Sequence, residues 1–515
     1  MINFQQKSKI IVYLIKAFIL LMLILFVCLL NIDFVYAQNI NIEMFSNNSL
    51  VRIDPTLMID KGIEVRLYDY KTDRASNLPP ESQLLNAGLE QSSKENFEEA
   101  IKDYTQALQF NSVFAKAYVS RAYARSQLGQ TEKAFEDYNK AVEIDPNLVD
   151  AYIGRGNLYF KQGDNETAIK DFELAISVNN NYYNAYFSRG SVYLKLGKYE
   201  EAIKEFSEAI SLNPQYLDAY TQRAYAKSDL KDYEGVVEDS TKAINLDVKK
   251  QEYIAYNNRG LAYFYLGKNQ EALKDLNQCL KINPRFSTAY YNRGLVLDNM
   301  RKYKEAIFSY DRALSYEPND FSAWLNRGSV FLNLGKYEEA IFSYDRALNY
   351  KSDDYDTWYN RALAFQNLGK YEEAVSSYDR ALNYKPDIYE AWDMRGFALA
   401  KLERYEEAVS SYDRALHYKP DYYQAWGKRG IALTQLGKYE EALASYDQVL
   451  NYHPDDYTAL YYKACIYGLQ GQLSLATDRL KQAIKLNPKY KEEAKADKDF
   501  DLIREQLEFQ ELLES

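Results

Sequence analysis

A pattern of 34 residues recurs from residue 81 almost to the end of the chain, and it constrains the fold more than any other feature. The hexapeptide Gly-Lys-Tyr-Glu-Glu-Ala, for example, occupies residues 335–340 and again residues 369–374. A chain with such a period stacks similar units that contact their neighbours and needs no single central core. The length of 515 residues therefore does not indicate several globular domains.

Numbering each unit 1 to 34 gives twelve units, which begin at residues 81, 115, 149, 183, 217, 253, 287, 321, 355, 389, 423 and 457. Only Gln251 and Glu252 fall outside this frame. Position 8 is Gly or Ala in all twelve units, position 20 is Ala in eleven, and position 32 is Pro in eight. Small residues let two helices approach closely, so we expect position 20 to face position 8, and proline ends the second helix.

These positions, with a large ring at position 4 from Tyr118 to Trp426, resemble the tetratricopeptide repeat family over residues 81–490. The resemblance implies an all-α fold, a right-handed α-solenoid superhelix of twelve helix-turn-helix repeats. Phe500, Ile503 and Leu507 then follow at helical spacing. This spacing predicts a C-terminal capping helix over 491–515 that covers the apolar flank of the last unit.

Composition argues against catalysis and against nucleic-acid binding. The net charge of -11 leaves no basic footprint for phosphates. Only two histidines, His417 and His453, and three cysteines are present, so general bases and metal ligands are scarce. Eight of the 21 glycines stand at position 8 and eight at position 15, which are packing and turn positions. We therefore expect no enzyme, no cofactor and no metal site.

The N-terminus resembles an export signal. Lys7 and Lys9 precede an apolar run over 17–30, and the tripeptide that ends at Ala37 resembles a signal-peptidase site, which predicts a cleaved signal peptide over 1–37. The alternative is an uncleaved membrane anchor over residues 10–30. Both hypotheses place the repeats outside the cytosol, in the periplasm, the envelope or the extracellular space. Residues 38–80 carry no repeat pattern and predict a linker.

Arginine stands at position 7 in ten units, from Arg121 to Arg429. At ~100° per residue, position 7 shares a side of the first helix with positions 4, 8 and 11, which form its packing side. An unpaired guanidinium is costly there, so we expect each arginine to pair with an acidic residue of a neighbouring helix.

Positions 2, 5, 6, 9, 12 and 13 lie on the opposite side, which in this family lines the concave inner wall. Asparagines recur there as Asn258, Asn292, Asn326 and Asn360 at position 6 and Asn299, Asn333 and Asn367 at position 13. Tyr291 and Tyr359 stand beside them at position 5. Columns of carboxamides can pair with the backbone of an extended peptide, so these residues are the predicted partner-binding site. Duplication without any ligand explains the columns equally well.

The sequence therefore predicts a protein-protein interaction scaffold that binds extended peptide segments or assembles envelope complexes on its concave surface. Partners would be other proteins or peptides, no nucleic acid, and a membrane only through an uncleaved N-terminus. One alternative is a glycan-binding scaffold for polysaccharide export, because tyrosine rings can stack on sugars. Another alternative is a membrane-anchored adaptor of the same repeat type.

Overall fold

The structure is a computed structural model that describes residues 78–247 and 252–514. The predicted signal peptide, its cleavage site at Ala37, the alternative anchor and nearly all of the linker lie outside the described residues. Every regular element between residue 78 and residue 514 is helical where the structure describes the chain. None of these helices is long and apolar enough to cross a membrane.

The described helices from α3 to α26 form twelve consecutive pairs. The first helices are α3 (Pro80–Ser93), α5 (Ala115–Gln127), α7 (Val149–Gln162), α9 (Tyr183–Lys195), α11 (Leu217–Asp229), α13 (Tyr253–Tyr265), α15 (Ser287–Asn299), α17 (Phe321–Asn333), α19 (Tyr355–Asn367), α21 (Tyr389–Lys401), α23 (Tyr423–Gln435) and α25 (Tyr457–Leu469). All but α3 begin at the residue where the 34-residue frame starts a unit, and α3 begins one residue earlier.

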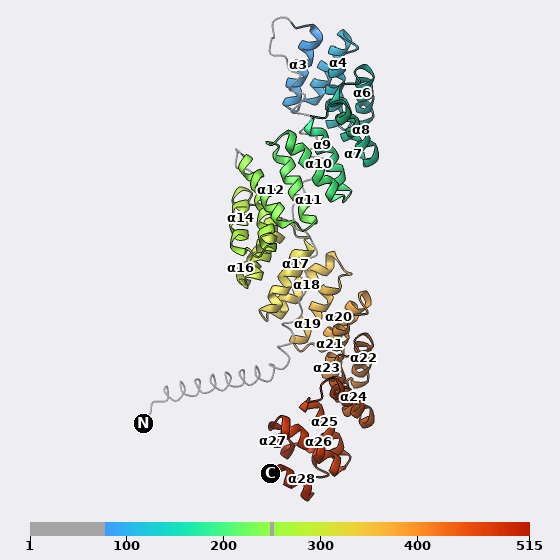
Figure 1. Cartoon of the computed structure of the whole chain (residues 1–515), viewed down its shortest axis with the longest axis vertical. Helices are drawn as coiled ribbons and strands as arrows, with labels where there is room; N and C mark the ends of the chain where they lie inside the picture. Colours follow the sequence, from blue (N-terminus) through green and yellow to red (C-terminus); the bar gives the residue numbers. More distant parts are fainter. Residues whose placement is uncertain (1–77, 248–251, 515) are drawn as a thin grey trace, which may run out of the picture. The chain divides into compact units, whose positions relative to one another are not determined.

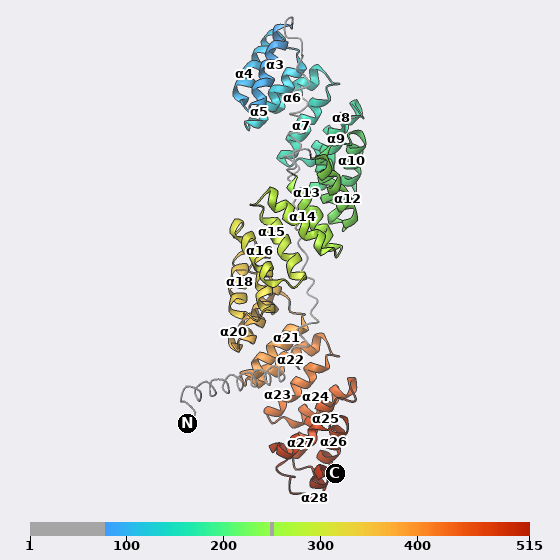
Figure 2. The same cartoon turned by 90° about the vertical axis from the view of Figure 1, so that its left-hand side faces the viewer.

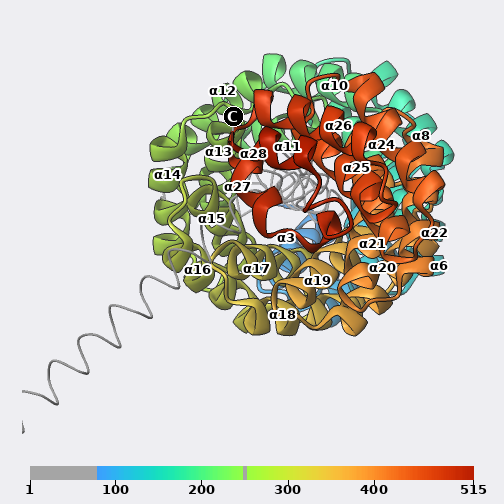
Figure 3. The ribbon, with the colours of Figure 1, turned by 90° about the horizontal axis from the view of Figure 1, so that it is seen from below.

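The second helices complete the pairs and have the same length throughout. They are α4 (Phe97–Phe110), α6 (Thr131–Ile144), α8 (Asn165–Val178), α10 (Tyr199–Leu212), α12 (Tyr233–Leu246), α14 (Asn269–Ile282), α16 (Tyr303–Tyr316), α18 (Tyr337–Tyr350), α20 (Tyr371–Tyr384), α22 (Tyr405–Tyr418), α24 (Tyr439–Tyr452) and α26 (Leu473–Leu486). Neighbouring pairs lie side by side in chain order (Figures 1 and 2). First helices such as α15 and α19 face inward and second helices such as α14 and α18 face outward (Figure 3).

Position 15 makes the turn between the two helices of a pair in the left-handed region. Eight units place glycine there, with φ between 68° and 86°. The other four units have Glu95, Lys231, Arg301 and Glu403 at φ between 57° and 61°. The turn geometry is therefore the same in every unit, and in four of them a side chain with a Cβ tolerates it.

In seven of the eight units with glycine at position 8, the nearest side chain is a ring at position 24 and not the alanine at position 20 that the sequence pattern suggested. In the eighth, Gly260 lies against Leu276 at position 24 and the backbone oxygen of Ala272 at position 20. A Cβ added to Gly88 would lie 2.4 Å from Cε1 of Tyr104, and one added to Gly294 would lie 2.5 Å from the corresponding atom of Tyr310. Both rings are fully buried. The small residue is needed because the ring of the second helix occupies the space that its side chain would fill.

The C-terminal end is not the single capping helix that the sequence predicted. It consists of α27 (Lys489–Ala496), the 3₁₀ helix η1 (Lys498–Phe500) and α28 (Leu507–Glu514). Phe500, Ile503 and Phe509 are buried as expected, but Leu507 is 71% exposed. Asp497 interrupts the helix because its carboxylate accepts a hydrogen bond from the backbone N–H of Asp499 and so begins η1.

Candidate functional site

The asparagines at position 6 are buried, which corrects the expectation that this position faces an open inner wall. Asn258 and Asn292 are 0% exposed, Asn360 2% and Asn326 8%. Tyr291 and Tyr359 at position 5 are buried too, and this burial raises the pKa of both phenols. The cause is stacking, because position 6 of each unit packs against position 5 of the unit before it.

Hydrogen bonds connect position 6 of one unit to position 5 of the unit before it. Nδ2 of Asn292 donates to Oδ1 of Asn257 at 2.9 Å. Nδ2 of Asn326 donates to the hydroxyl of Tyr291 at 3.0 Å. The same connection recurs further along as an ion pair, in which Lys428 Nζ lies 2.8 Å from Asp393. Position 6 thus joins consecutive first helices, and this role accounts for Asn292 and Asn326.

Asn360 has no such partner. The residue at position 5 of the unit before it is Leu325, which offers no acceptor. Among the described residues, Nδ2 of Asn360 makes no hydrogen bond. The asparagines at position 6 therefore do not all make the same contact with the preceding unit.

The sequence held a signal that position 6 is a packing position. Units 2 to 4 have Ser120, Gly154 and Ser188 there, all small residues. A Cβ on Gly154 would lie 2.3 Å from Cε1 of Tyr138 in the preceding unit. Small residues in consecutive units mark close approach, as they do at position 8. The prediction missed this contact because the helical projection considered one unit at a time.

The asparagines at position 13 are exposed, as expected. Asn299 accepts a hydrogen bond from Asn269 at 3.0 Å, and Asn367 donates to the backbone carbonyl of Leu363 at 2.8 Å. Asn333 is also exposed. Of the predicted set, these three amides are the ones that a partner can reach in this structure.

Apolar side chains accompany position 13 one turn earlier, at position 9, and from unit 6 to unit 11 they become more accessible along the chain. Leu261 and Leu295 are 0% and 5% exposed, whereas Leu363 and Phe397 are half-buried and Ile431 is 39% exposed. Residues four apart share a helix face. In α19, α21 and α23 the resulting pairs, which we call the inner strip, are Leu363 with Asn367, Phe397 with Lys401, and Ile431 with Gln435.

Nine of the ten position-7 arginines pair with acids as predicted, in two arrangements. In units 2 to 6 the acid stands at position 23 of the same unit and is at most 8% exposed. The pairs are Arg121–Asp137 (2.8 Å), Arg155–Asp171 (2.7 Å), Arg189–Glu205 (2.8 Å), Arg223–Asp239 (2.6 Å) and Arg259–Asp275 (2.6 Å).

In units 8 to 11 the acid stands instead at position 25 of the preceding unit, and serine occupies position 23. The pairs are Arg327–Asp311 and Arg361–Asp345 at 2.7 Å, and Arg395–Asp379 and Arg429–Asp413 at 2.6 Å. These aspartates are 47–50% exposed. The arrangement changes at unit 7, whose Arg293 hydrogen-bonds only to Ser309 and Asn277 and has no acid partner among the described residues.

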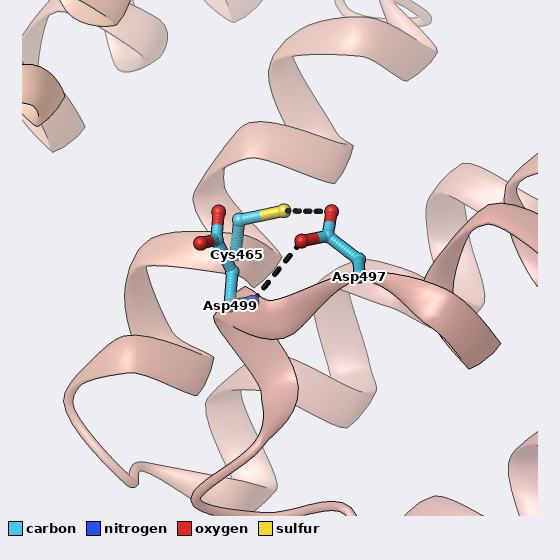
Figure 4. A group of neighbouring side chains, drawn as sticks. All are labelled: Cys465, Asp497 and Asp499. Carbon is cyan, nitrogen blue, oxygen red and sulfur yellow. Dashed lines mark hydrogen bonds between the residues drawn. The ribbon is translucent and has the colours of Figure 1, made fainter.

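A cysteine and two aspartates meet where the last unit contacts the C-terminal segment (Figure 4). The thiol of Cys465 lies 3.7 Å from Oδ2 of Asp497, which also accepts a hydrogen bond from the hydroxyl of Tyr461 at 2.7 Å. Burial and the adjacent carboxylates raise the pKa of the thiol. A protonated thiol donates to the carboxylate, so we assign these contacts to attaching α25 to η1.

The second described cysteine, Cys279, is a buried packing residue of α14. Burial raises the pKa of its thiol to about 12. Both described cysteines are unpaired.

Twelve helix pairs with a shared register and nearest-neighbour contacts define a helical repeat protein of the solenoid class. The chain belongs to the tetratricopeptide repeat family. Models of that family match residues 84–113, 122–163, 156–197, 183–216, 253–286, 287–320, 309–342, 328–369, 355–388, 394–450 and 428–491. Membership supports a protein-interaction scaffold. No curated protein matches the chain.

Solved structures of repeat proteins resemble parts of the chain. YrrB, a TPR protein with an unusual peptide-binding site, is 23% identical over 36% of this chain and 97% of its own, with a TM-score of 0.35. A tetratricopeptide repeat protein from Parabacteroides merdae is 17% identical over 49% of this chain and 98% of its own, with a TM-score of 0.39. A chain of the APC/C hetero-tetramer Cut9-Hcn1 is 14% identical over 91% of this chain and 99% of its own, with a TM-score of 0.35.

Proposed function

We propose that this scaffold holds an extended segment of a partner protein on the inner strip of α19, α21 and α23. The observation that carries the proposal is the exposure of Ile431 beside the half-buried Phe397, at a position that is closed in units 6 and 7. Asn367, Lys401 and Gln435 add exposed polar groups at the same spacing. Accessible apolar side chains beside exposed polar groups suit a peptide, whose backbone needs hydrogen bonds and whose side chains need apolar contact.

The experiment uses the full chain with a photo-crosslinking amino acid at Asn333, and it compares the captured partner between variants. Phe397→Asp combined with Ile431→Asp should abolish the capture. Leu174→Asp is the matched control, because Leu174 is an apolar residue of α8 with 46% exposure that lies far along the chain from the strip. Retained capture by the double variant would overturn the inner strip as the binding surface.

An exported location is part of the proposal, and it rests on residues 1–37 of the sequence. The exported protein assembles complexes in the cell envelope or outside the cell. N-terminal sequencing of protein from a fractionated envelope distinguishes cleavage after Ala37 from an anchor over 10–30. Recovery of the chain in the cytosolic fraction would contradict export.

Glycan binding is a second candidate because tyrosines at position 30 form an exposed row. Tyr350, Tyr384, Tyr418 and Tyr452 end four consecutive second helices and are 36–45% exposed. Phenol rings with one accessible face can stack on sugars. A glycan array probed with the full chain tests this candidate, and binding that survives Tyr384→Ser with Tyr418→Ser would refute it.

A further inference from the structure

Unit 7 carries a positive charge, on Arg293 of α15, that no acidic residue of the described chain pairs with. Arg293 is half-buried, and its Nε and Nη1 donate to Ser309 at 3.1 Å and to Asn277 at 3.3 Å, both neutral acceptors. It is the one position-7 arginine within residues 78–247 and 252–514 that makes no ion pair. Burying a guanidinium without a counter-charge costs free energy, so an anion from outside the chain would stabilise Arg293.

Asn277 occupies the place where the following units have an acid. It stands at position 25 of unit 6, and positions 25 of units 7 to 10 are the aspartates that pair with the next arginine. Asn277 is exposed, so this place is open to solvent. A carboxylate from outside the chain would complete the arrangement that Asp311 provides for Arg327.

A second arginine lies beside the first. Arg312 of α16 and Arg293 both lie over the ring of Tyr290, with 5.6 Å and 5.1 Å between guanidinium carbon and ring centroid. Arg312 also donates to the hydroxyl of Tyr316 at 3.0 Å. Burial and the charge of Arg312 lower the pKa of Arg293, against the opposing effect of Tyr290. Two guanidinium groups close to one ring offer hydrogen-bond donors and positive charge for a carboxylate.

Exposed phenylalanines stand on the second helices α16 and α18. Phe308 and Phe342 stand at position 22 of consecutive units and are 58% and 55% exposed. Position 22 is an exposed Lys or Glu in units 1 to 6 and Ser, Ser, Ala and Asp in units 9 to 12. Phe308 lies four residues before Arg312 on α16, so both face the same way. Exposed rings at positions that are otherwise polar or small indicate a contact surface.

The local charge fits an acidic ligand. Residues 253–320 contain ten lysines and arginines against seven aspartates and glutamates, in a chain whose net charge is -11. An acidic segment is therefore attracted to this part of the chain and repelled by the rest, which also disfavours long polyanions.

We propose that α14, α16 and α18, together with Arg293 of α15, form a docking site for an acidic segment of a partner protein, with a carboxylate on Arg293 and Arg312 and an apolar side chain against Phe308 and Phe342. This site is separate from the inner strip, and all of its residues except Arg293 of α15 lie on second helices. It would let the scaffold hold two partners at once.

The test measures binding of fluorescein-labelled peptides to the full chain by fluorescence polarisation. The probes are Ser-Asp-Glu-Phe-Glu-Asp-Leu-Ser, the same peptide with Lys for each acid, and a short duplex DNA. We expect only the acidic peptide to bind. No binding of the acidic peptide, equal binding of the Lys peptide, or stronger binding of DNA would each overturn the proposal.

The decisive variant is Asn277→Asp, which supplies the missing counter-charge from within the chain. It should weaken binding of the acidic peptide about tenfold while raising the thermal stability of the protein, which shows that the variant folds. Asn139→Asp is the matched control. Asn139 stands at the same position 25 and contacts Arg155 at 2.8 Å, but Arg155 already pairs with Asp171.

Asn139→Asp should leave the affinity unchanged, as should Phe397→Asp with Ile431→Asp on the inner strip, so the two binding surfaces are tested apart. Phe308→Lys, which introduces the residue type that unit 6 has at this position, should also weaken binding of the acidic peptide. An affinity for Asn277→Asp equal to that of the unsubstituted chain would overturn the site.

Discussion

Nδ2 of Asn292 lies 2.9 Å from Oδ1 of Asn257, and this hydrogen bond crosses from one unit to the unit before it. Both side chains are fully buried. The bond therefore fixes how two consecutive first helices lie against each other.

Asn292→Leu should loosen this junction. It leaves Oδ1 of Asn257 buried without its donor, which costs about 1–3 kcal/mol of local stability. Asn360→Leu is the comparison, because Nδ2 of Asn360 has no acceptor among the described residues and its replacement should cost far less. Native-state hydrogen exchange measures the local unfolding free energy at each of the two junctions, which is appropriate because a repeat array does not unfold in a single step. Equal losses at both positions would show that the hydrogen bond is unimportant.

The two arrangements of the position-7 arginines should differ in strength. Asp239 is 0% exposed and pairs with both Arg223 and Lys227, so Asp239→Asn leaves two cations with no counter-charge at a cost of about 3 kcal/mol. Asp413 is 50% exposed, so Asp413→Asn should cost under about 1 kcal/mol. Local unfolding free energies from hydrogen exchange check the order, and a larger loss at Asp413 would contradict the burial argument.

Two glycines of α23 should respond in opposite directions to alanine. A Cβ at Gly430 would lie 2.7 Å from Cζ of the buried Tyr446, and Gly430→Ala should destabilise the unit by about 1–3 kcal/mol. A Cβ at Gly427 would meet only Cγ2 of Val449, at 3.9 Å, so Gly427→Ala should stabilise the helix by up to about 1 kcal/mol. Thermal melts of the two variants provide the comparison, and a loss at Gly427 would be the contrary result.

Glu403 occupies a turn position that favours glycine, with φ of 58°. Glu403→Gly should stabilise its unit by about 0.5–1 kcal/mol, because a residue with a Cβ is strained in the left-handed region. Gly437→Ala, at the same position of the next unit and φ of 72°, should have the opposite effect. Melting temperatures that move in the same direction for both variants would contradict this account.

The sequence was sufficient to predict the helix pairs because each position has a requirement within its own unit. Gly88 must leave room for Tyr104, and Pro146 must end a helix. Contacts between units were harder to predict, since they depend on the angle at which one pair stacks on the next. Burial of Asn292 follows from that stacking. The shift of the arginine partner from Asp275 to Asp311 accompanies a change in residue type, because position 23 becomes serine and position 25 becomes aspartate.

These contacts between units most strongly limited the prediction of the binding residues. Asn326 and Asn333 are seven residues apart on one helix and share a face in projection, yet Asn326 lies under the preceding unit and Asn333 is exposed. A helix of this length contacts two neighbouring units along only part of its inner side. The exposed part is near its C-terminal end, and the sequence pattern alone does not indicate where the coverage stops.

Asp298 should make stability depend on pH. Burial raises the pKa of this carboxyl from its ordinary value of 3.8 to about 6, and it makes no ion pair within the described part of the chain. Between these two values the folded protein binds a proton that the unfolded chain releases, so stability falls as the pH rises through this window. Asp298→Asn removes the effect and should raise stability by about 1–2 kcal/mol above pH 6, with no gain below pH 4. Other buried carboxyls titrate in both proteins, so the difference between the two denaturation curves isolates Asp298. A difference that is constant from pH 4 to pH 7 would mean that the carboxyl keeps its ordinary pKa.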